Sequence, residues 1–436
     1  MWKAEILAIG SELLIGGRTD TNSLFLTSQL ALLGVEVRFK SVVGDEEADI
    51  ADVIRTAVRR ADVVVMTGGL GPTEDDLTRE AVARVTGRPL RRRAQALESM
   101  RRRLAAWGRM PAAAQLRQAL IPAGAEVLIN PVGTAPGFCL EWKGAFLAAL
   151  PGVPAEARAM ATAEVLPRLQ RRIAGRSGRE QPAPIVRRVL HTFGLPESEI
   201  DLRLRGVVPR DSGIRLGLQA SPLGVLVSMT ASPAAMGSKR LRSTSPARAV
   251  DVLTRVFHEI RRRLGEFAFA EGEDAMEAVV GRLLADKQLT LAVAESCTGG
   301  LIGHRLTQVP GASTYLDRVV VSYSNRSKTE LLGVPNELIV EHGAVSDAVA
   351  AAMAKGVRER SGTAVGLSAT GIAGPGGGTA AKPVGLVYVG LDWGGENSLT
   401  RGFRFHGDRD AIKLRSSQAA LDLLRRWLLG LGADHR

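Results

Sequence analysis

The sequence is poor in cysteine, poor in aromatic residues and free of long apolar runs. Its two cysteines, Cys139 and Cys297, among 436 residues are too few for a disulfide framework, so we expect the reducing environment of the cytoplasm. No apolar stretch reaches the ~18 residues of a membrane-spanning helix, so we expect no membrane partner. The opening residues, MWKAEILAIG, enter a strand-like pattern and lack the small-residue cleavage site of a signal peptide.

Acidic residues are too few to balance the basic ones in the front part of the chain. Residues 271–436 contain equal numbers of basic and acidic side chains, so the net charge of +12 arises within residues 1–270. Much of the excess lies in two arginine-rich stretches, 88–109 and 168–188. Such stretches can bind nucleic acid, but aromatic residues make up only 4% of the chain and do not alternate with the arginines. We therefore expect solvated helix faces and no nucleic-acid partner.

A chain of 436 residues is too long for one hydrophobic core, and its pattern indicates three units. In residues 1–172, apolar strand-like runs alternate with amphipathic helical stretches, which predicts a doubly wound parallel sheet. Residues 173–265 predict a small α+β connector, which starts with a Gly-, Ser-, Arg- and Pro-rich linker at 174–184. Within the connector, residues 232–248 have no apolar period and predict a surface loop. Residues 271–436 alternate again and predict a second α/β domain.

The strongest chemical signal is the segment AESCTGG, residues 294–300, between a buried strand and a helix. Ser296 would stand on a tight turn at the carboxyl edge of the sheet, where N–H groups of the following helix could stabilise an oxyanion. Gly299 and Gly300 would allow the backbone to approach a ligand closely. The neighbouring Cys297 is the alternative nucleophile.

A serine hydroxyl needs a base to become a nucleophile, and the segment YSNRSK, residues 323–328, supplies one. Lys328 would lose its proton more readily if it were desolvated, and Tyr323 could relay a proton through a hydrogen bond. A cysteine nucleophile would favour a histidine partner, and none falls in an obvious motif, so the pattern favours Ser296. The competing bases of this domain are His304, His342 and His406.

Two further segments of the same domain suit a phosphate or a carboxylate. Residues 368–378, SATGIAGPGGG, follow a strand and contain enough glycine to surround a phosphate with backbone N–H groups. Residues 407–410, GDRD, place Arg409 at a helix start, where its guanidinium can hold an anion. Either segment alone would be a common structural turn, but both accompany the serine and the lysine.

Together, AESCTGG, YSNRSK, EHGAVS (341–346), GIAGPGGG (371–378) and GDRD resemble the C-terminal amidase domain of the CinA family of competence/damage-inducible proteins. The resemblance implies hydrolysis of nicotinamide mononucleotide (NMN) to nicotinate mononucleotide and ammonia, without a cofactor. It also implies that Ser296 is the nucleophile, Lys328 the general base and Tyr323 an accessory hydrogen-bonding group. The substrate-binding residues that we expect in this domain are Thr298, Gly299, Gly300, Ser313, Thr370, Gly371, Gly374 and Arg409.

The segment TGGLGPTEDD, residues 67–76, follows a buried strand and precedes a helix in the front domain. Glycine N–H groups and the helix start suit a pyrophosphate, and Asp75 or Asp76 could hold a divalent cation between phosphate oxygens. The alternative role for these aspartates is helix N-capping. We expect the ligand at the carboxyl edge of the parallel sheet, lined by Ser11, Asp20, Asn22, Gly68, Gly69, Gly71 and Thr73.

This segment and LPGVPAE, residues 150–156, resemble the molybdopterin-binding-like domain at the front of CinA proteins. The resemblance implies a metal-dependent ADP-ribose pyrophosphatase that yields AMP and ribose 5-phosphate. A pterin ligand stays open, because molybdenum-cofactor enzymes share the fold. HTFGLPESEID, residues 191–201, resembles the KH-like connector of the same family, but lacks the GXXG clamp of RNA-binding KH domains.

The combined expectation is a bifunctional enzyme of pyridine-nucleotide recycling that acts on NMN and ADP-ribose and forms a homodimer. Two alternatives stay open. The N-terminal domain could be a non-catalytic module for ligand binding or dimerisation, or the chain could be an accessory factor that acts on nucleic acid through its arginine-rich front.

Overall fold

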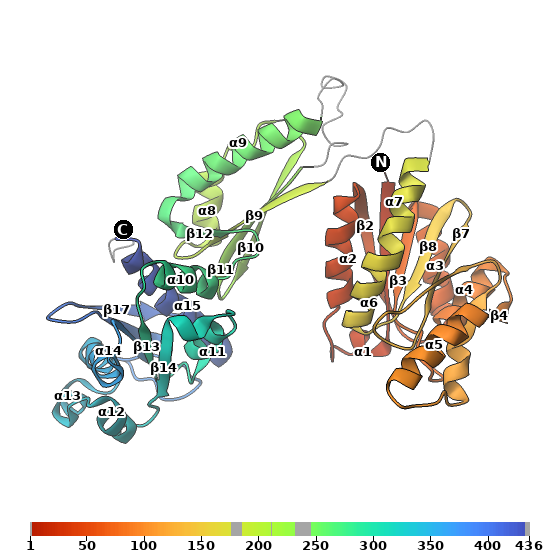
Figure 1. Cartoon of the computed structure of the whole chain (residues 1–436). Helices are drawn as coiled ribbons and strands as arrows, with labels where there is room; N and C mark the ends of the chain where they lie inside the picture. Colours follow the sequence, from red (N-terminus) through yellow and green to blue (C-terminus); the bar gives the residue numbers. More distant parts are fainter. Residues whose placement is uncertain (1, 176–184, 211, 232–245, 432–436) are drawn as a thin grey trace. The chain divides into compact units, whose positions relative to one another are not determined.

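The computed structural model describes residues 2–175, 185–210, 212–231 and 246–431 (Figure 1). Two compact units divide the chain: the first holds residues 1–186 with two short segments of the connector, and the second holds the rest of the connector and the C-terminal domain. Residues 176–184 of the expected linker and 232–245 of the expected loop lie outside the described residues. In the part of the chain that is described, no helix is both long enough and apolar enough to span a bilayer.

The N-terminal unit contains a six-stranded sheet in the order β2-β1-β3-β8-β7-β6. The four strands on one side, which carry the ligand motifs, are parallel as predicted. Each of the last two, β7 and β6, pairs antiparallel with the strand before it in this order, and the turn at Lys143 and Gly144 reverses the chain between β7 and β8. Both turn residues have positive φ, the geometry of a two-residue hairpin. In chain order, the strands of this sheet are β1 (Trp2–Ile9), β2 (Val35–Val43), β3 (Val63–Thr67), β6 (Glu126–Leu128), β7 (Gly137–Trp142) and β8 (Ala145–Leu150).

Helices cover both faces of this sheet, so the expectation of a doubly wound fold is confirmed. Alternate side chains of β1 enter different cores: Leu7 and Ile9 pack on one face, and Ala4 and Ile6 on the other. A small two-stranded antiparallel sheet of β4 (Leu90–Arg92) and β5 (Leu120–Pro122), which the sequence pattern did not predict, forms separately. The helices are α1 (Ser11–Leu14), α2 (Thr21–Leu32), α3 (Glu47–Arg60), α4 (Thr78–Thr86), α5 (Ala94–Ala106), α6 (Pro154–Met160) and α7 (Leu166–Gly175).

The connector is a four-stranded sheet in the order β10-β11-β9-β12, accompanied by two helices. Its last strand, β12, pairs antiparallel with β9 and lies beyond residue 265, where the sequence pattern ended the connector. Four residues are too few to show a period, which is why the pattern missed this strand. The elements are β9 (Val186–Thr192), α8 (Glu197–Leu204), β10 (Ile214–Ser221), β11 (Gly224–Ala231), α9 (Pro246–Leu264) and β12 (Ala268–Glu271).

The C-terminal domain is built on a five-stranded sheet in the order β14-β13-β15-β16-β17. The strands β13, β14 and β15 are parallel, and each of the last two reverses direction, so β17 runs the same way as β13. The strands are β13 (Leu291–Glu295), β14 (Leu316–Val321), β15 (Val365–Gly371), β16 (Leu386–Asp392) and β17 (Ser398–Arg404). The helices are α10 (Met276–Asp286), α11 (Leu301–Thr307), α12 (Asn325–Leu332), α13 (Asn336–His342), α14 (Asp347–Ser361) and α15 (Arg409–Leu428).

This topology gathers the motifs of the domain at one edge. The parallel strands β13, β14 and β15 end there together with β17, and β16 begins there. The AESCTGG, YSNRSK, GIAGPGGG and GDRD segments therefore all leave their strands at the carboxyl edge of the sheet.

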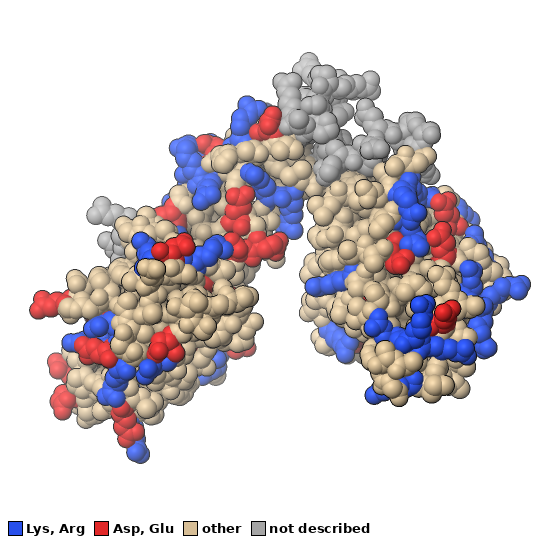
Figure 2. Space-filling view, viewed as in Figure 1, with Lys and Arg blue, Asp and Glu red and all other residues tan. Residues whose placement is uncertain are grey.

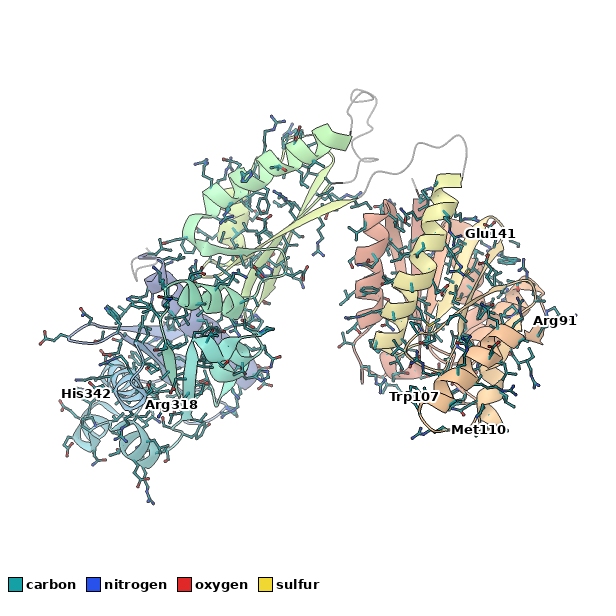
Figure 3. The ribbon with its side chains drawn as sticks, viewed as in Figure 1. Arg91, Trp107, Met110, Glu141, Arg318 and His342 are labelled. Atoms are coloured by element: carbon teal, nitrogen blue, oxygen red, sulfur yellow. The ribbon has the colours of Figure 1, made fainter. Side chains whose placement is uncertain are left out.

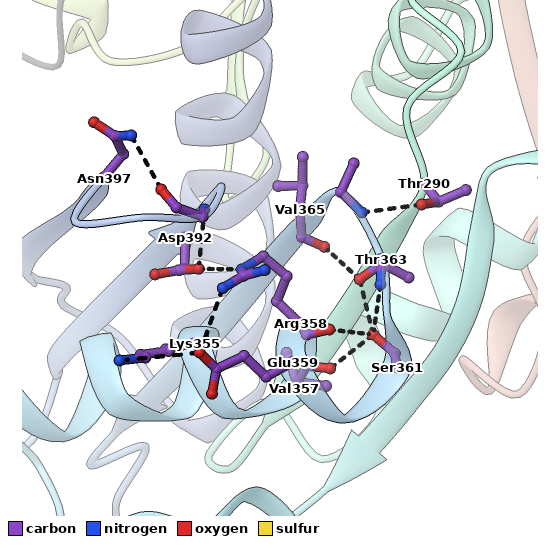
Figure 4. A network of polar contacts seen from close by, with 12 residues as sticks. Thr290, Lys355, Val357, Arg358, Glu359, Ser361, Thr363, Val365, Asp392 and Asn397 are labelled. Carbon is purple, nitrogen blue, oxygen red and sulfur yellow. Dashed lines mark hydrogen bonds and ion pairs between the residues drawn. The ribbon is translucent and has the colours of Figure 1, made fainter.

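A polar network closes the opposite edge, where β15 begins and β16 ends (Figure 4). The guanidinium of Arg358, near the end of α14, pairs with the buried carboxylate of Asp392. The Oγ of Ser361 lies 2.8 Å from the Oγ1 of Thr363, and the N–H of Ala364 donates to the Oγ1 of Thr290 at 3.0 Å. These contacts bind α14 to the sheet on the side away from the motifs.

Candidate functional site

The centre of the C-terminal site is the pair Ser296 and Lys328. The ammonium nitrogen Nζ of Lys328, in α12, lies 2.9 Å from the Oγ of Ser296 and 2.9 Å from the carbonyl oxygen of Ser322. Lys328 is only 1% exposed and Ser296 only 7%. Burial lowers the pKa of Lys328, because a charged amine loses its hydration there. A neutral amine in hydrogen-bonding reach of a serine hydroxyl is a competent general base.

Parallel strand pairing explains how residues 32 positions apart meet. Glu295, the last residue of β13, pairs with Val321, the last residue of β14, so the segments that follow both strands emerge side by side. Ser324 then caps α12, with its Oγ accepting from the N–H of Ser327, so the helix starts at this edge. The first turn of that helix carries Lys328 back toward the serine.

Glu295 holds the turn that carries the nucleophile, and the sequence reasoning gave it no role. Its fully buried carboxylate accepts hydrogen bonds from the N–H groups of Gly300, Ile302 and Gly303, at 2.9, 3.2 and 2.8 Å. These are N–H groups at the start of α11. The expectation that the start of α11 offers free donors to an oxyanion is therefore wrong for these three groups, because an internal carboxylate already occupies them.

The backbone of the same turn requires its glycines. Gly299 and Gly300 have φ values of 61° and 94°, which residues with a Cβ rarely adopt. The N–H of Ser296 donates to the carbonyl oxygen of Ala369 at 2.9 Å. Within the described residues, the N–H groups of Cys297 and Thr298 have no oxygen acceptor and lie against the thiol of Cys297.

The structure separates the two candidate nucleophiles. Cys297 is 5% exposed and belongs to the hydrophobic core of the domain, whereas the hydroxyl of Ser296 faces Lys328. Burial raises the pKa of the Cys297 thiol to about 12, so the thiolate is not populated near neutral pH. The geometry thus favours Ser296 as the nucleophile.

The three alternative bases do not reach the serine. In the described part of the chain, the side chains of His304, His342 and His406 make no hydrogen bond to Ser296. The labelled His342 in Figure 3 ends α13, where its Nε2 lies 3.6 Å from the carboxylate of Glu341.

Arg409 links three of the motifs. One of its terminal nitrogens donates to the hydroxyl of Tyr323 at 2.6 Å, and the other donates to the carbonyl oxygen of Gly374. Tyr323 is 60% exposed, and its hydroxyl contacts Arg409 instead of Lys328 or Ser296. In this structure Tyr323 therefore positions an arginine at the rim of the site, and the expected proton relay to Lys328 is not formed.

Lys413 is a cation of the site that the sequence reasoning did not consider. It lies one helical turn after Arg409 on α15, so both side chains project from the same face of that helix. Its Nζ is 3.8 Å from the position that a Cβ on Gly299 would take. None of the described carboxylates pairs with Lys413. The four-residue spacing from Arg409 was the available signal.

The buried threonines of the site are tied to the backbone or enclosed. The hydroxyl of Thr370 donates to the carbonyl oxygen of Ala344 at 2.8 Å, which joins the end of β15 to the EHGAVS segment. Thr298 is fully buried, and its hydroxyl has no hydrogen-bond partner among the described residues. Gly371 ends β15 beside them, at the expected edge.

Ser313 does not lie in the Ser296 site of the same chain, so its expected role as a substrate-binding residue there is wrong. It belongs to the short 3-10 helix Ala312–Thr314 that precedes β14. The N–H of Leu291, at the start of β13, donates to the carbonyl oxygen of Tyr315 at 2.7 Å. Since Ser296 follows the other end of that five-residue strand, about 16 Å separates the two serines. The connection between parallel strands must return the chain to the amino edge.

In the N-terminal domain, the expected residues gather around the ends of β1, β3 and β8. The side-chain amide of Asn22 donates to the carbonyl oxygen of Gly152 at 2.8 Å, and Gly68 adjoins both Gly152 and the carbonyl oxygen of Ile9. The side-chain oxygen of Asn22 is buried and has no donor among the described residues. A buried acceptor without a donor suits a ligand hydroxyl or amine.

Several of these residues instead hold the local backbone. Asp20 caps α2 by accepting from the N–H of Ser23 at 2.9 Å. Ser11 exchanges hydrogen bonds with Asp45, at 2.7 and 3.2 Å. The hydroxyl of Thr78 donates to the carbonyl oxygen of Gly68 at 2.8 Å and lies against Gly69. The structure therefore places Ser11 and Asp20 beside the crevice mainly as loop-forming residues.

The two aspartates of TGGLGPTEDD have different surroundings. Asp76 accepts from the N–H groups of Gly71 and Thr73, at 2.7 and 2.9 Å, and so closes the loop on itself. Arg79, which the sequence reasoning did not consider, is 1% exposed and donates to the carbonyl oxygens of Leu70 and Gly71. Asp75 is exposed.

No group of three or more metal-ligating side chains exists among the residues described. Among the described residues of the loop, Glu74 and Asp75 are exposed carboxylates, whereas both oxygens of Asp76 accept hydrogen bonds from the loop itself. Magnesium is often held by one or two carboxylates together with phosphate oxygens of the ligand. The loop therefore suits a cation that arrives with a phosphate-bearing ligand.

The arginine-rich stretch 88–109 forms exposed faces of β4 and α5. Figure 2 shows Lys and Arg side chains gathered over this part of the N-terminal unit. Arg91, labelled in Figure 3, and Arg101 are exposed, as is Trp107 just after α5. Arg102 approaches Glu98 at 3.8 Å, an exposed pair of a kind that contributes little stability.

Comparison with known proteins shows three matching families, one for each part of the chain. Residues 5–171 match "Probable molybdopterin binding domain", residues 187–270 match "Damage-inducible protein CinA KH domain", and residues 273–428 match "CinA C-terminal domain". A putative competence-damage inducible protein of Moorella thermoacetica is 44% identical over 98% of this chain and 99% of its own. A CinA-like protein of Myxococcus xanthus is 42% identical over 99% of both chains.

Among solved structures, the protein CinA from Thermoplasma acidophilum, with unknown function, is 36% identical. It covers 37% of this chain and 94% of its own, with a TM-score of 0.35. A structure from Agrobacterium tumefaciens titled competence/damage inducible protein CihA is 40% identical over 34% of this chain and 93% of its own, with a TM-score of 0.33. With relatives above 40% identity along almost its full length, the chain belongs to the CinA family.

Proposed function

We propose that the C-terminal domain is an amide hydrolase and that its substrate is NMN. The observation that carries this proposal is the buried contact of 2.9 Å between the Nζ of Lys328 and the Oγ of Ser296. The choice of NMN as the substrate rests on the resemblance of the surrounding motifs to the CinA amidase domain.

The chemistry begins with Lys328 in its neutral form, which burial favours. The carbonyl oxygen of Ser322 accepts one N–H of the amine, which leaves the lone pair directed at Ser296. As the Oγ of Ser296 bonds to the carboxamide carbon, its proton passes to the Nζ of Lys328. Glu295 does not accept from the N–H groups of Cys297 and Thr298, whose acceptor is only the weak one of the Cys297 thiol. We assign these two donors to the oxyanion.

Lys328 then returns the proton to the amide nitrogen, the C–N bond breaks, and ammonia leaves. The nicotinoyl group stays bound to Ser296 as an ester. Water gives a proton to Lys328 and bonds to the ester carbon, after which the proton passes back to the Oγ as the ester breaks. The released acid is nicotinate mononucleotide, and the enzyme regains its starting state.

The cations on α15 suit the phosphate end of such a substrate. Arg409 and Lys413 stand on one helix face beside the glycine-rich turns, and no described carboxylate neutralises either one. A phosphate would bring them an acceptor for charge-assisted hydrogen bonds.

The deciding experiment incubates the full chain with NMN and quantifies ammonia together with nicotinate mononucleotide. We expect both products in equal amounts, and neither with Ser296→Ala. Ser398→Ala, which removes an exposed serine at the other edge of the same sheet, is the matched control and should keep full activity. Equal activity of the Ser296 and Ser398 variants would reject this assignment of the nucleophile.

For the N-terminal domain, we propose binding and cleavage of ADP-ribose to AMP and ribose 5-phosphate. The unpartnered, buried side-chain oxygen of Asn22 beside the glycine turns supports a nucleotide ligand there. Asp75 would hold a divalent cation, which would polarise a phosphoryl oxygen. Assays with Mg²⁺, Mn²⁺ and Co²⁺ should detect AMP, and Asp75→Asn should reduce its formation more than the neighbouring Glu74→Gln. No turnover with any of these metals would favour a non-catalytic module.

A further inference from the structure

A cavity of about 540 Å³ lies within the second unit, between the connector and the edge strand β17. We call it the connector cavity. Its connector side comes from the turn before α8 and the turn between β10 and β11, and its other side from β17 and α15. Its size falls within the roughly 300–1,000 Å³ typical of small-molecule sites. Its lining includes Phe193, Glu197, Ala220, Phe403, Arg404 and Arg415.

The lining of the connector cavity is cationic. Three arginines, Arg401, Arg404 and Arg415, face one carboxylate, that of Glu197. No carboxylate in the described ranges pairs with Arg404 or Arg415. The Nε of half-buried Arg415 is enclosed and has no hydrogen-bond partner among the described residues. The rest of the Arg415 side chain lines the cavity, so the site suits an anion that pairs with its guanidinium.

The same cavity offers flat apolar surface. The rings of Phe403 and Phe405 are stacked, with centroids 5.4 Å apart and planes 11° from parallel. Phe193 contributes a third ring from the connector side. Aromatic faces next to arginine side chains are the surroundings in which planar heterocycles bind.

The connector cavity is separate from the Ser296 site. Ser296 follows β13, and the cavity is lined by β17. Two strands, β15 and β16, lie between them, so β13 and β17 are about 14 Å apart across the sheet. On α15, Arg415 follows Lys413 by two residues, about 200° around the helix, so the two cations face different sides.

We infer that the connector cavity binds a mononucleotide, with Arg415 and Arg404 on its phosphate and the phenylalanines against its base. This role is independent of the amide chemistry, because none of these residues belongs to the Ser296 site.

The test is calorimetric titration of the full chain with AMP as the probe, beside adenosine and inorganic phosphate. We expect saturable AMP binding, with each fragment binding more weakly because it keeps one of the two recognition elements. Arg415→Gln should weaken AMP binding by about tenfold or more, as expected for the loss of one charge-assisted contact. Ammonia release from NMN should stay unchanged in that variant.

Two further variants test whether AMP binds in the connector cavity. Ala220→Trp fills the connector cavity from an exposed strand position and should also remove binding without unfolding the chain. Arg318→Gln, labelled in Figure 3 on β14, removes one exposed arginine from the far side of the same sheet and should leave binding intact. AMP also fits the nucleotide site proposed for the N-terminal domain, so the stoichiometry decides. A number of AMP sites that both Arg415→Gln and Ala220→Trp leave unchanged, or no saturable binding in the unaltered chain, would overturn the inference.

Discussion

The Nζ of Lys328 donates a hydrogen bond of 2.9 Å to the Oγ of Ser296, and both side chains are almost completely buried. The contact couples the protonation of the amine to the nucleophilicity of the hydroxyl. A protonated Lys328 can only donate to the serine, whereas a neutral one can accept its proton. The behaviour of the site with pH follows from this pair.

The first prediction is that kcat/KM for NMN rises with pH as one basic group, Lys328, loses its proton. Activity requires neutral Lys328, so the rate is low below its pKa and reaches a plateau above it. Burial lowers that pKa, so the midpoint should fall below the ordinary lysine value of 10.5. A kcat/KM profile measured between pH 5 and pH 11 gives the midpoint. A midpoint at or above the ordinary value would contradict the assigned base, and Lys328→Met should abolish the titration with the activity.

The second prediction concerns Cys297. The pKa of its thiol is raised to about 12 by burial, as is that of Cys139, so neither should react with iodoacetamide at neutral pH while the chain is folded. Mass spectrometry before and after denaturation gives the labelling. Cys297→Ala should keep most NMN turnover and lower the free energy of unfolding by about 1 kcal/mol, because it removes a small apolar group from the core. Loss of turnover in a folded Cys297→Ala variant would return the nucleophile to the cysteine.

The third prediction addresses Glu295. Glu295→Gln keeps the shape of the side chain. It replaces one of the two oxygens that accept from the N–H groups at the start of α11 with an NH2 group, which can only donate. We expect a loss of about 1–3 kcal/mol in unfolding free energy and a lower kcat, since the nucleophile turn is no longer held. Glu277→Gln, a partly buried carboxylate paired with Arg305, is the matched control and should lose stability without a comparable loss of kcat. Chemical denaturation and steady-state kinetics separate the two effects.

The fourth prediction is that Lys413 binds the phosphate of the substrate. Lys413→Ala should raise KM for NMN by about tenfold, the cost of one charge-assisted contact, and leave turnover of nicotinamide riboside nearly unchanged. Lys413→Arg should restore much of the affinity, because the charge remains. Equal losses on the nucleotide and the nucleoside would show that Lys413 only supports the turn at Gly299.

The sequence by itself determined the elements and the local turns of the site. An apolar strand, a serine and two glycines before a helix predict a strand-to-helix turn from local physics alone, and the structure has it at Leu291–Thr307. The alternation of strands and helices likewise predicted the α/β domains, and the resemblance of the motifs predicted the family. These features depend on residues close together in the chain.

Only the tertiary structure decided which side chains meet. Adjacent residues project to different sides of a turn, so the core position of Cys297 and the contact of Ser296 with Lys328 follow from the packing and pairing of β13 and β14. Parallel pairing also sends Ser313 to the far edge of the sheet, although its place in the sequence gives no sign of it. The roles of Glu295, Lys413 and Arg415 depend on neighbours that the fold brings from distant segments, and a linear pattern carries no record of them.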